Sequence, residues 1–150
     1  MKDAFHCVSP KSTDQFKKYY HLRWQILRKP YGQVLGSEKD DYENVSFHQM
    51  VLDSNKKVVA VGRIHCLNIN QNIAQIRFMA VHNHYVNKGI GREILVNLEM
   101  YANNNNIKKI ILHSRLSAIG FYLKNGYKKI KKTHILYNQI HHWLMQKELK

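Results

Sequence analysis

The sequence is poor in cysteine and has no long hydrophobic run. Cys7 and Cys66 lie far apart and form no C-x-x-C motif, which argues against a zinc site or a disulfide framework and fits a reducing compartment. We expect both to be small core residues. No apolar segment follows Lys2 as it would in a signal peptide, and no run approaches the roughly 18 apolar residues of a membrane span. We therefore expect a soluble, cytoplasmic protein that does not associate with membranes.

Acidic residues are also scarce. The chain has 10 Asp and Glu against 24 Lys and Arg, which gives a formal charge of +14. Such a balance favours anionic partners, such as a phosphorylated cofactor, an acidic carrier protein or nucleic acid, without choosing among them. With 150 residues and 44% hydrophobic content, the chain is long enough to bury roughly 70% of its unfolded surface. We expect residues 1–150 to form a single domain.

Two glycines stand where the pattern of the chain changes from extended to helical. The apolar run that begins at Ile76 ends in a polar turn, and Gly89 and Gly91 then open a helix. A Gly-x-Gly turn at a helix start gathers backbone N–H groups at the positive end of the helix, which favours phosphate. Ile94 stands where a dinucleotide-binding motif needs its third glycine, and the Lys-Ser/Thr pair of a Walker A loop is missing. The turn predicts a cofactor phosphate site of another kind.

The periodicity of the apolar residues predicts a mixed α/β order. Helices are expected near residues 12–28, 90–102 and 118–125, and a short helix or turn is expected at 37–45. Ser12 and Ser117 are expected to cap the first and third of these helices. Strands are expected at 4–9, 46–53, 57–69, 73–81, 108–113, 127–138 and 141–149. Short polar turns predict an antiparallel meander, whereas the helix before strand 108–113 allows that strand to lie parallel to strand 73–81. We expect an α+β mixed sheet with helices on both faces and a slot where the two parallel strands diverge.

Two segments resemble motifs of the GNAT acetyltransferase superfamily. VNKGIGR at 86–92 resembles the R/Q-x-x-G-x-G/A turn between a strand and a helix, and RLSAIGFYLKNGY at 115–127 resembles the later N-x-x-A-x-x-F-Y-x-x-x-G-F motif. The front of the chain, at 19–41, 48–53 and 59–63, resembles the GNAT domain that some bacterial proteins carry ahead of a hotdog thioesterase domain. The resemblance implies the GNAT fold, a mostly antiparallel sheet with one splayed parallel pair, and this chain would be the GNAT part alone.

The resemblance also implies a reaction, in which an amine attacks the thioester of acetyl-CoA directly. Backbone groups of residues 79–81 would pair with the pantetheine arm and polarise the thioester carbonyl, amides of residues 87–92 would hold the pyrophosphate, and Tyr122 would be the general acid that protonates the CoA thiolate. The residues expected to bind CoA are Met79, Ala80, Val81, Asn87, Lys88, Gly89, Ile90, Gly91, Arg92, Arg115, Ser117, Phe121, Tyr122 and Lys124. We expect no metal, because neither His82 with His84 nor His141 with His142 has a marked third ligand.

The chain departs from the family pattern at two positions, and its general base is open. Val86 replaces the Arg or Gln that begins the phosphate loop, a loss for which Lys88 and Arg92 could compensate. Arg115 replaces the Asn that usually bonds to pantetheine, and a longer cation there could meet a carboxylate or phosphate instead. The candidates for the base are Glu38, His48 and His113, and a water chain is the alternative; strand 73–81 has Gln75 and Arg77 where family members often have Glu.

Three functions stay open on the sequence alone. The first, which the two motifs together favour over the others, is acetyl transfer from acetyl-CoA to an amine of a small molecule or protein. The second is a GNAT-fold enzyme that acts on an acyl-CoA or on an acidic acyl carrier protein without amine transfer. The third is a catalytically inactive module that binds CoA or, as a less favoured reading, nucleic acid. The lysines between residues 128 and 132 are expected to form a solvated strand edge, and pairing through the last strands would give a homodimer.

Overall fold

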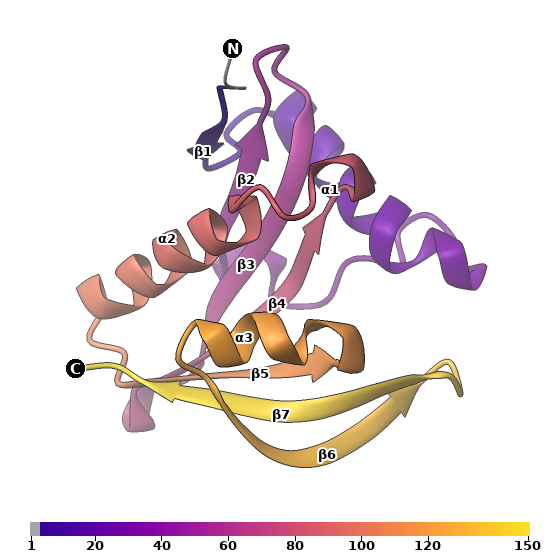
Figure 1. Ribbon diagram of the computed structural model, residues 1–150. Helices are drawn as coiled ribbons and strands as arrows, with labels where there is room; N and C mark the ends of the chain where they lie inside the picture. The colour runs from indigo at the N-terminus through magenta and orange to yellow at the C-terminus, as the bar shows by residue number, and fades with distance from the viewer. Residues whose placement is uncertain (1–3) are drawn as a thin grey trace.

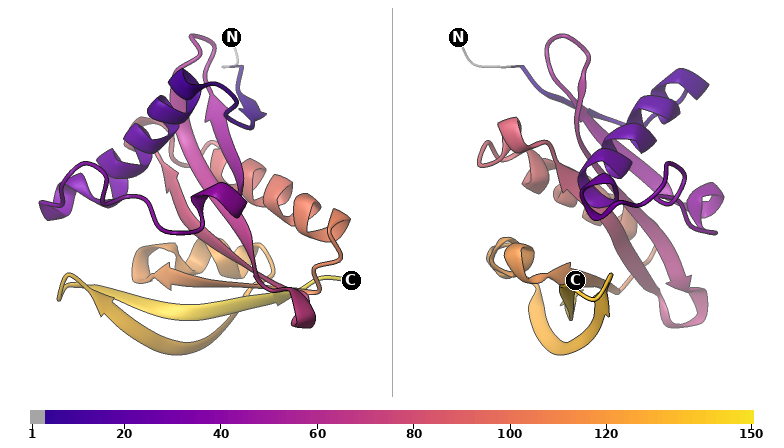
Figure 2. Two further views of the ribbon diagram at one scale, coloured as in Figure 1. Left: turned by 180° about the vertical axis from the view of Figure 1, so that it is seen from behind. Right: turned by 90° about the vertical axis from the view of Figure 1, so that its right-hand side faces the viewer.

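A seven-stranded sheet in the order β1-β2-β3-β4-β5-β7-β6 organises the protein, of which the computed structural model describes residues 4–150 (Figure 1). The strands are β1 His6–Val8, β2 Phe47–Leu52, β3 Val58–Asn68, β4 Ile73–Val81, β5 Lys109–Arg115, β6 Lys128–Leu136 and β7 Ile140–Glu148, and the helices are α1 Thr13–Leu27, α2 Ile90–Asn104 and α3 Ile119–Lys124. Helices α2 and α3 cover one face of the sheet and α1 covers the other (Figure 2). The predicted α+β mixed sheet is confirmed; residues 1–3 of the predicted domain lie outside the described residues.

The first helix begins and ends as its sequence predicts. Ser12 and Gln15 form a capping box, in which the Gln15 N–H donates to Ser12 Oγ at 3.0 Å and Gln15 Oε1 accepts from the Ser12 N–H at 3.3 Å. The helix ends at Leu27, shortly before Pro30. The prediction that Ser117 caps α3 is wrong. The chain makes a 3-10 turn over Leu116–Ala118 that runs directly into α3, and no described side chain caps that helix.

Each face of the sheet has its own core. On the α2 face, the core includes Ile64, Ile76, Ile94, Leu98 and Ile110, and on the α1 face it includes Tyr19, Leu22, Met50, Val61 and Phe78. The two cysteines are less buried than expected. Cys7 is half-buried, and Cys66 is exposed because it lies close to the turn Ile69–Gln71 at which the β3–β4 hairpin reverses. The expectation that Cys66 belongs to the core is therefore wrong.

Strands β4 and β5 form the predicted parallel pair, and they separate early. Their pairing covers only Ile73 with Lys109, Ala74 with Ile110, and Gln75 with Ile111. Beyond this point β4 stays paired with β3, while β5 stays paired with β7. A bulge in β4 accompanies the separation, because the register with β3 shifts at Phe78, whose φ is +59°. The divergence creates the slot that the sequence predicts.

Strand β6 forms the edge of the sheet at the end away from β1, and it is exposed over nearly all of its length. Its four lysines face solvent, as predicted for an edge strand that resists pairing with other sheets. Between residues 4 and 150, no helix combines the length and the apolar composition needed to cross a membrane.

Candidate active site

A cavity of about 230 Å³ opens where β4 and β5 diverge. Its walls come from the middle of β4, the end of β5, the α3 region, the end of α1, and the β6–β7 pair. The lining residues are Leu27, Arg28, Gln75, Ile76, Arg77, Phe78, Met79, Leu112, His113, Ser114, Arg115, Ala118, Tyr122, His134, Leu136 and His142. The cavity thereby brings together four predicted site residues from outside the phosphate loop, namely Met79, His113, Arg115 and Tyr122.

Tyr122 reaches the cavity from α3. The residue is only 6% exposed, and burial raises the pKa of its phenol well above the ordinary value. The hydroxyl is therefore protonated at neutral pH, and it makes no hydrogen bond to any residue between 4 and 150. A protonated phenol without an internal partner is able to donate its proton to a group bound in the cavity.

The bulge in β4 determines which backbone groups face the slot. The positive φ of Phe78 turns the chain just before Met79, and Met79 lines the cavity whereas Ala80 and Val81 lie beyond it. The side chain of Met79 packs over Gly62 of β3, where an added Cβ would lie 2.5 Å from Met79 Sδ and 2.6 Å from Ile94 Cγ2. Any larger residue at this position would force Met79 or Ile94 to shift, and the sequence alone did not single this glycine out.

The predicted phosphate loop precedes α2. Asn87 and Gly89 have left-handed φ values of 62° and 77°, which direct successive N–H groups to one side, and no described side chain caps the helix start. A Cβ added at Gly91 would lie 3.5 Å from both Phe121 Cζ on α3 and Val81 Cγ2 at the end of β4. The loop thus lies on the face that carries Tyr122. Asn87, Lys88, Gly89 and Arg92 are exposed, and Ile90 is buried in the core.

Ser117 and Lys124, the remaining predicted CoA-binding residues, are exposed at the two ends of the α3 region. Val86, the first departure from the family pattern, is also exposed. None of these three side chains lines the cavity.

Of the three candidate bases, His113 alone lines the cavity. Its Nδ1 lies 3.2 Å from Thr133 Oγ1, and its ring lies 5.4 Å from that of His134. Burial, together with the neighbouring His134 and Arg77, lowers the pKa of His113, which favours the neutral imidazole that a base requires.

Despite the nearby His142, no set of three potential metal ligands converges anywhere in the described part of the chain.

Glu38 and His48 lie outside the cavity lining. Both ring nitrogens of His48 are engaged, Nδ1 with the Tyr19 hydroxyl at 2.8 Å and Nε2 with the Glu43 carbonyl oxygen at 2.8 Å. Glu38 is buried in the loop after α1, where its Oε1 accepts from the Gly36 N–H at 2.8 Å. Sequence reasoning did not reveal these partners, because Tyr19 lies on α1, far from His48 in the chain, and the others depend on the fold of the loop after α1.

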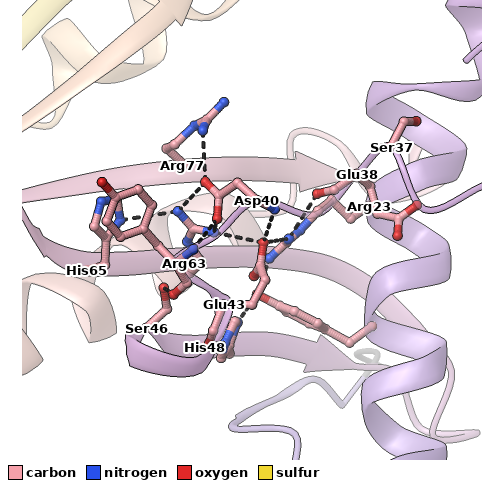
Figure 3. Close-up of polar contacts among 12 residues, drawn as sticks. Arg23, Ser37, Glu38, Asp40, Glu43, Ser46, His48, Arg63, His65 and Arg77 are labelled. Carbon is pink, nitrogen blue, oxygen red and sulfur yellow. Dashed lines mark hydrogen bonds and ion pairs between the residues drawn. The ribbon is translucent and has the colours of Figure 1, made fainter.

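Beside the cavity is a buried cluster of ions that the sequence did not predict (Figure 3). Arg23 and Arg63 are fully buried. Glu43 Oε2 accepts from Arg23 at 2.9 Å and from Arg63 at 2.8 Å. Burial opposes ionisation of Asp40, but hydrogen bonds from Arg63 and from the Tyr42 N–H outweigh it and hold the pKa of that carboxyl below its usual value. The one available signal was an acidic stretch in an otherwise basic chain.

Three arginines line the cavity itself. Arg77 donates to Asp40 Oδ2 at 2.8 Å. Arg28 donates to the carbonyl oxygens of Leu27 and Ser37, each at 3.1 Å. Arg115 contacts the Tyr31 hydroxyl at 3.4 Å and the Leu27 carbonyl oxygen at 3.5 Å.

Comparisons with known proteins agree with this geometry. A family model described as an acetyltransferase (GNAT) domain matches residues 31–149. The uncharacterized N-acetyltransferase YjcF of Bacillus subtilis (strain 168) is 28% identical over 141 residues, covering 94% of this chain and 98% of that protein. A GNAT-family acetyltransferase from Staphylococcus aureus Mu50 has the same fold, with a TM-score of 0.78 at 19% identity over 98% of this chain and 100% of that one.

A third similar structure is a chimera of the spermidine N-acetyltransferase SpeG from Vibrio cholerae and hSSAT. It matches with a TM-score of 0.73 at 13% identity, covering 96% of this chain and 95% of that one. The family match covers most of the chain, and it coincides with the splayed strands and the glycine turn described above. The chain therefore belongs to the GNAT family and is an N-acetyltransferase.

Proposed function

We propose that the protein transfers an acetyl group from acetyl-CoA to a primary amine by direct attack. The observation that carries the proposal is the divergence of β4 and β5 after Gln75 and Ile111, which leaves one cavity lined by Met79, His113 and Tyr122. The amine nitrogen bonds to the thioester carbonyl carbon, and the carbon–sulfur bond then breaks. A base removes the proton of the amine, and an acid returns one to the CoA sulfur.

The donor lies on the α2 and α3 face. Amides of residues 87–92, at the uncapped start of α2, hold the pyrophosphate. The pantetheine arm runs along residues 79–81 of β4 beside the bulge, where a backbone N–H stabilises the charge that develops on the thioester oxygen. The Phe121 ring lies 3.5 Å from the position that a Cβ added at Gly91 would take, which supports a continuous path from this loop to Tyr122. Ser117, in the turn before α3, and Lys124, at the end of α3, border the path.

Tyr122 and His113 supply the proton transfers. Tyr122 protonates the departing thiolate, a role supported by its place in the cavity and by a hydroxyl that stays protonated at neutral pH. His113 accepts the proton of the amine directly or through water, a role supported by its place in the cavity and its lowered pKa. Arg115 lies at the end of β5 near α1 and takes part in binding the acceptor rather than pantetheine.

Calorimetric titration with acetyl-CoA and with CoA tests the donor site. The matched variants are Gly89→Asp and Gly89→Asn, whose new side chains have the same shape and differ in charge. Both tolerate the left-handed φ of this position better than most residues, and nothing lies within 4 Å of the added Cβ. We expect micromolar binding by the wild type, which corresponds to about −8 kcal/mol. Gly89→Asp should lose at least tenfold more affinity than Gly89→Asn, because only the aspartate repels phosphate.

Release of CoA in the presence and absence of amines then tests the reaction. Release that needs an amine, with an acetylated amine as the product, supports acetyl transfer. Release at the same rate without an amine would instead support the second function, action on thioesters alone. Absence of acetyl-CoA binding by the wild type, or equal affinity of the two Gly89 variants, would contradict the proposed donor site.

A further inference from the structure

We propose that the acceptor amine also carries a carboxylate or phosphate, which is bound by the guanidinium groups of Arg28 and Arg115. This inference rests on the proposed function and names the class of acceptor. The substrates it selects are small amines with an anionic group, such as amino acids or amino-sugar phosphates.

The two arginines converge from different parts of the fold. Arg28 directly follows α1, and Arg115 is the last residue of β5. Arg28 Nη1 donates to the Leu27 carbonyl oxygen at 3.1 Å, and Arg115 Nη2 reaches the same oxygen at 3.5 Å. Both side chains line the cavity. They therefore present a pair of guanidinium groups to one ligand.

Two stacked tyrosines flank the pair. The ring of Tyr31 lies 5.6 Å from that of Tyr137. The guanidinium of Arg115 lies 5.5 Å from the Tyr31 ring, and that of Arg28 lies 5.9 Å from the Tyr137 ring. These contacts hold the guanidinium groups in place without neutralising them, because an aromatic ring supplies no net charge.

Neither guanidinium has a carboxylate partner in the described part of the chain. Arg28 is only 9% exposed, yet it bonds to carbonyl oxygens alone. The neighbouring carboxylates are already occupied, since Asp40 binds Arg63 and Arg77 while Glu43 binds Arg23 and Arg63. Among the described residues, the cavity lining contains three arginines and neither Asp nor Glu. A buried cation without a counter-ion is costly, and a bound anion would remove that cost.

The position of the pair assigns it to the acceptor. Arg28 and Arg115 contact the end of α1, which covers one face of the sheet, whereas the predicted phosphate loop and α3 lie on the other (Figure 2). The paired N–H groups of a guanidinium match the oxygens of a carboxylate or phosphate. The same site repels a polyamine, which has no anionic group to offset its charge.

Matched pairs of amines test the class of acceptor. The pairs are phenylalanine with phenethylamine, lysine with cadaverine, and glucosamine 6-phosphate with glucosamine, each assayed by CoA release at saturating acetyl-CoA. We expect a kcat/KM at least tenfold higher for the anionic member of the pairs that react. The amino-acid pairs and the sugar pair separate a carboxylate from a phosphate. Equal or higher kcat/KM for the members without an anion would overturn the inference.

Charge-removing variants test the residues. Arg28→Gln and Arg115→Gln should each raise KM for the anionic acceptor by roughly tenfold to one hundredfold, the usual effect of losing charged hydrogen bonds. Arg115→Lys should recover part of that loss because it restores the charge. Lys108→Gln, which removes one charge from an exposed position outside the cavity, is the control and should leave KM unchanged. Thermal unfolding identifies any variant that fails to fold.

Binding measurements separate this inference from the proposed function. Acetyl-CoA affinity should be the same in the wild type and both Gln variants; failure of the wild type to bind acetyl-CoA would refute the proposed function itself. A loss of acetyl-CoA affinity in the Gln variants, with acceptor KM unchanged, would assign the arginines to the donor and overturn the inference. If no tested amine reacts, acetate and inorganic phosphate are titrated into CoA-saturated protein. Binding that is lost in both Gln variants supports the inference, and absence of binding overturns it.

Discussion

Arg63 donates to both carboxylate oxygens of Asp40, from Nη1 to Oδ1 at 2.6 Å and from Nη2 to Oδ2 at 2.9 Å. This two-point contact ties the loop after α1 to β3, and Glu43 ties the same loop to α1 through Arg23. The acidic loop is thereby used to neutralise arginines beside the cavity (Figure 3). The guanidinium groups of Arg28 and Arg115 are left without such a partner among the described residues.

Loss of the buried ion pair should destabilise the protein strongly. We expect Arg63→Met to lower the free energy of unfolding by about 3–5 kcal/mol, because it leaves the half-buried carboxylates of Asp40 and Glu43 without this fully buried cation. The matched control is Lys18→Met, which removes an exposed pair with Asp14 at 3.2 Å and should cost less than about 1 kcal/mol. Urea unfolding followed by circular dichroism measures both values. Similar losses in the two variants would show that the buried cluster adds no special stability.

The sequence predicted the fold well because its signals are local. The capping box at Ser12, the alternation along the strands and the glycine turn before α2 each depend on a few neighbouring residues. The site was harder to predict from the sequence. Burial of Arg63 depends on a partner in a distant loop, and basic side chains are ordinarily read as exposed.

The same limit applies to the catalytic candidates and to the slot. Glu38, His48 and His113 are equivalent as titratable residues in the sequence, and only the fold brings His113 to the cavity. The bulge at Phe78 has no signal in its own residue type, because a positive φ is uncommon for phenylalanine. The bulge arises where β4 remains paired with β3 after β5 has separated from β4.

A methyl group at Gly62 should disturb the core. An added Cβ would lie within 2.6 Å of Met79 and Ile94 atoms, so we expect Gly62→Ala to destabilise the protein by about 1–3 kcal/mol. Gly120→Ala is the control, since nothing lies within 4 Å of its added Cβ, and alanine in a helix should stabilise by about 0.5–1 kcal/mol. Thermal and urea unfolding report both changes. A neutral Gly62→Ala would mean that Met79 moves aside without cost.

Removal of the Tyr122 hydroxyl should slow catalysis without harming the fold. We expect Tyr122→Phe to lower kcat by about 10²–10⁴-fold at neutral pH, the usual contribution of a general acid, with acetyl-CoA affinity unchanged. The control is Tyr127→Phe, which removes a hydroxyl that donates to Glu99 at 2.9 Å outside the cavity lining. That change should cost about 1 kcal/mol of stability and leave kcat intact. A Tyr122→Phe enzyme with wild-type kcat would assign the proton transfer to another group.

Acidification should weaken the protein through His65, which is 2% exposed and stacks on Tyr42. Burial, followed by the positive charge of Arg63, lowers the pKa of His65 to about 4. The unfolded chain, with a histidine pKa near 6.5, therefore binds a proton more readily than the folded protein. Stability should be complete above about pH 6.5 and should fall as the pH drops toward 4, by roughly 2–3 kcal/mol from this residue. His142, whose pKa is also lowered to about 4 by burial and by His134, acts in the same direction.

Urea unfolding at several pH values between 4 and 7 measures this dependence. His65→Phe keeps a ring against Tyr42 and removes the titrating group, so its stability should fall less steeply with acidification than that of the wild type. His21→Phe, a change at an exposed imidazole, should keep the wild-type slope. Protonation of Asp40 affects only the stabilities measured at the lowest pH. A carboxyl whose pKa is lowered by folding loses its contribution to stability as the pH falls below its pKa of 3.8 in the unfolded chain. An unchanged slope in His65→Phe would show that protonation of this buried imidazole is not what destabilises the protein in acid.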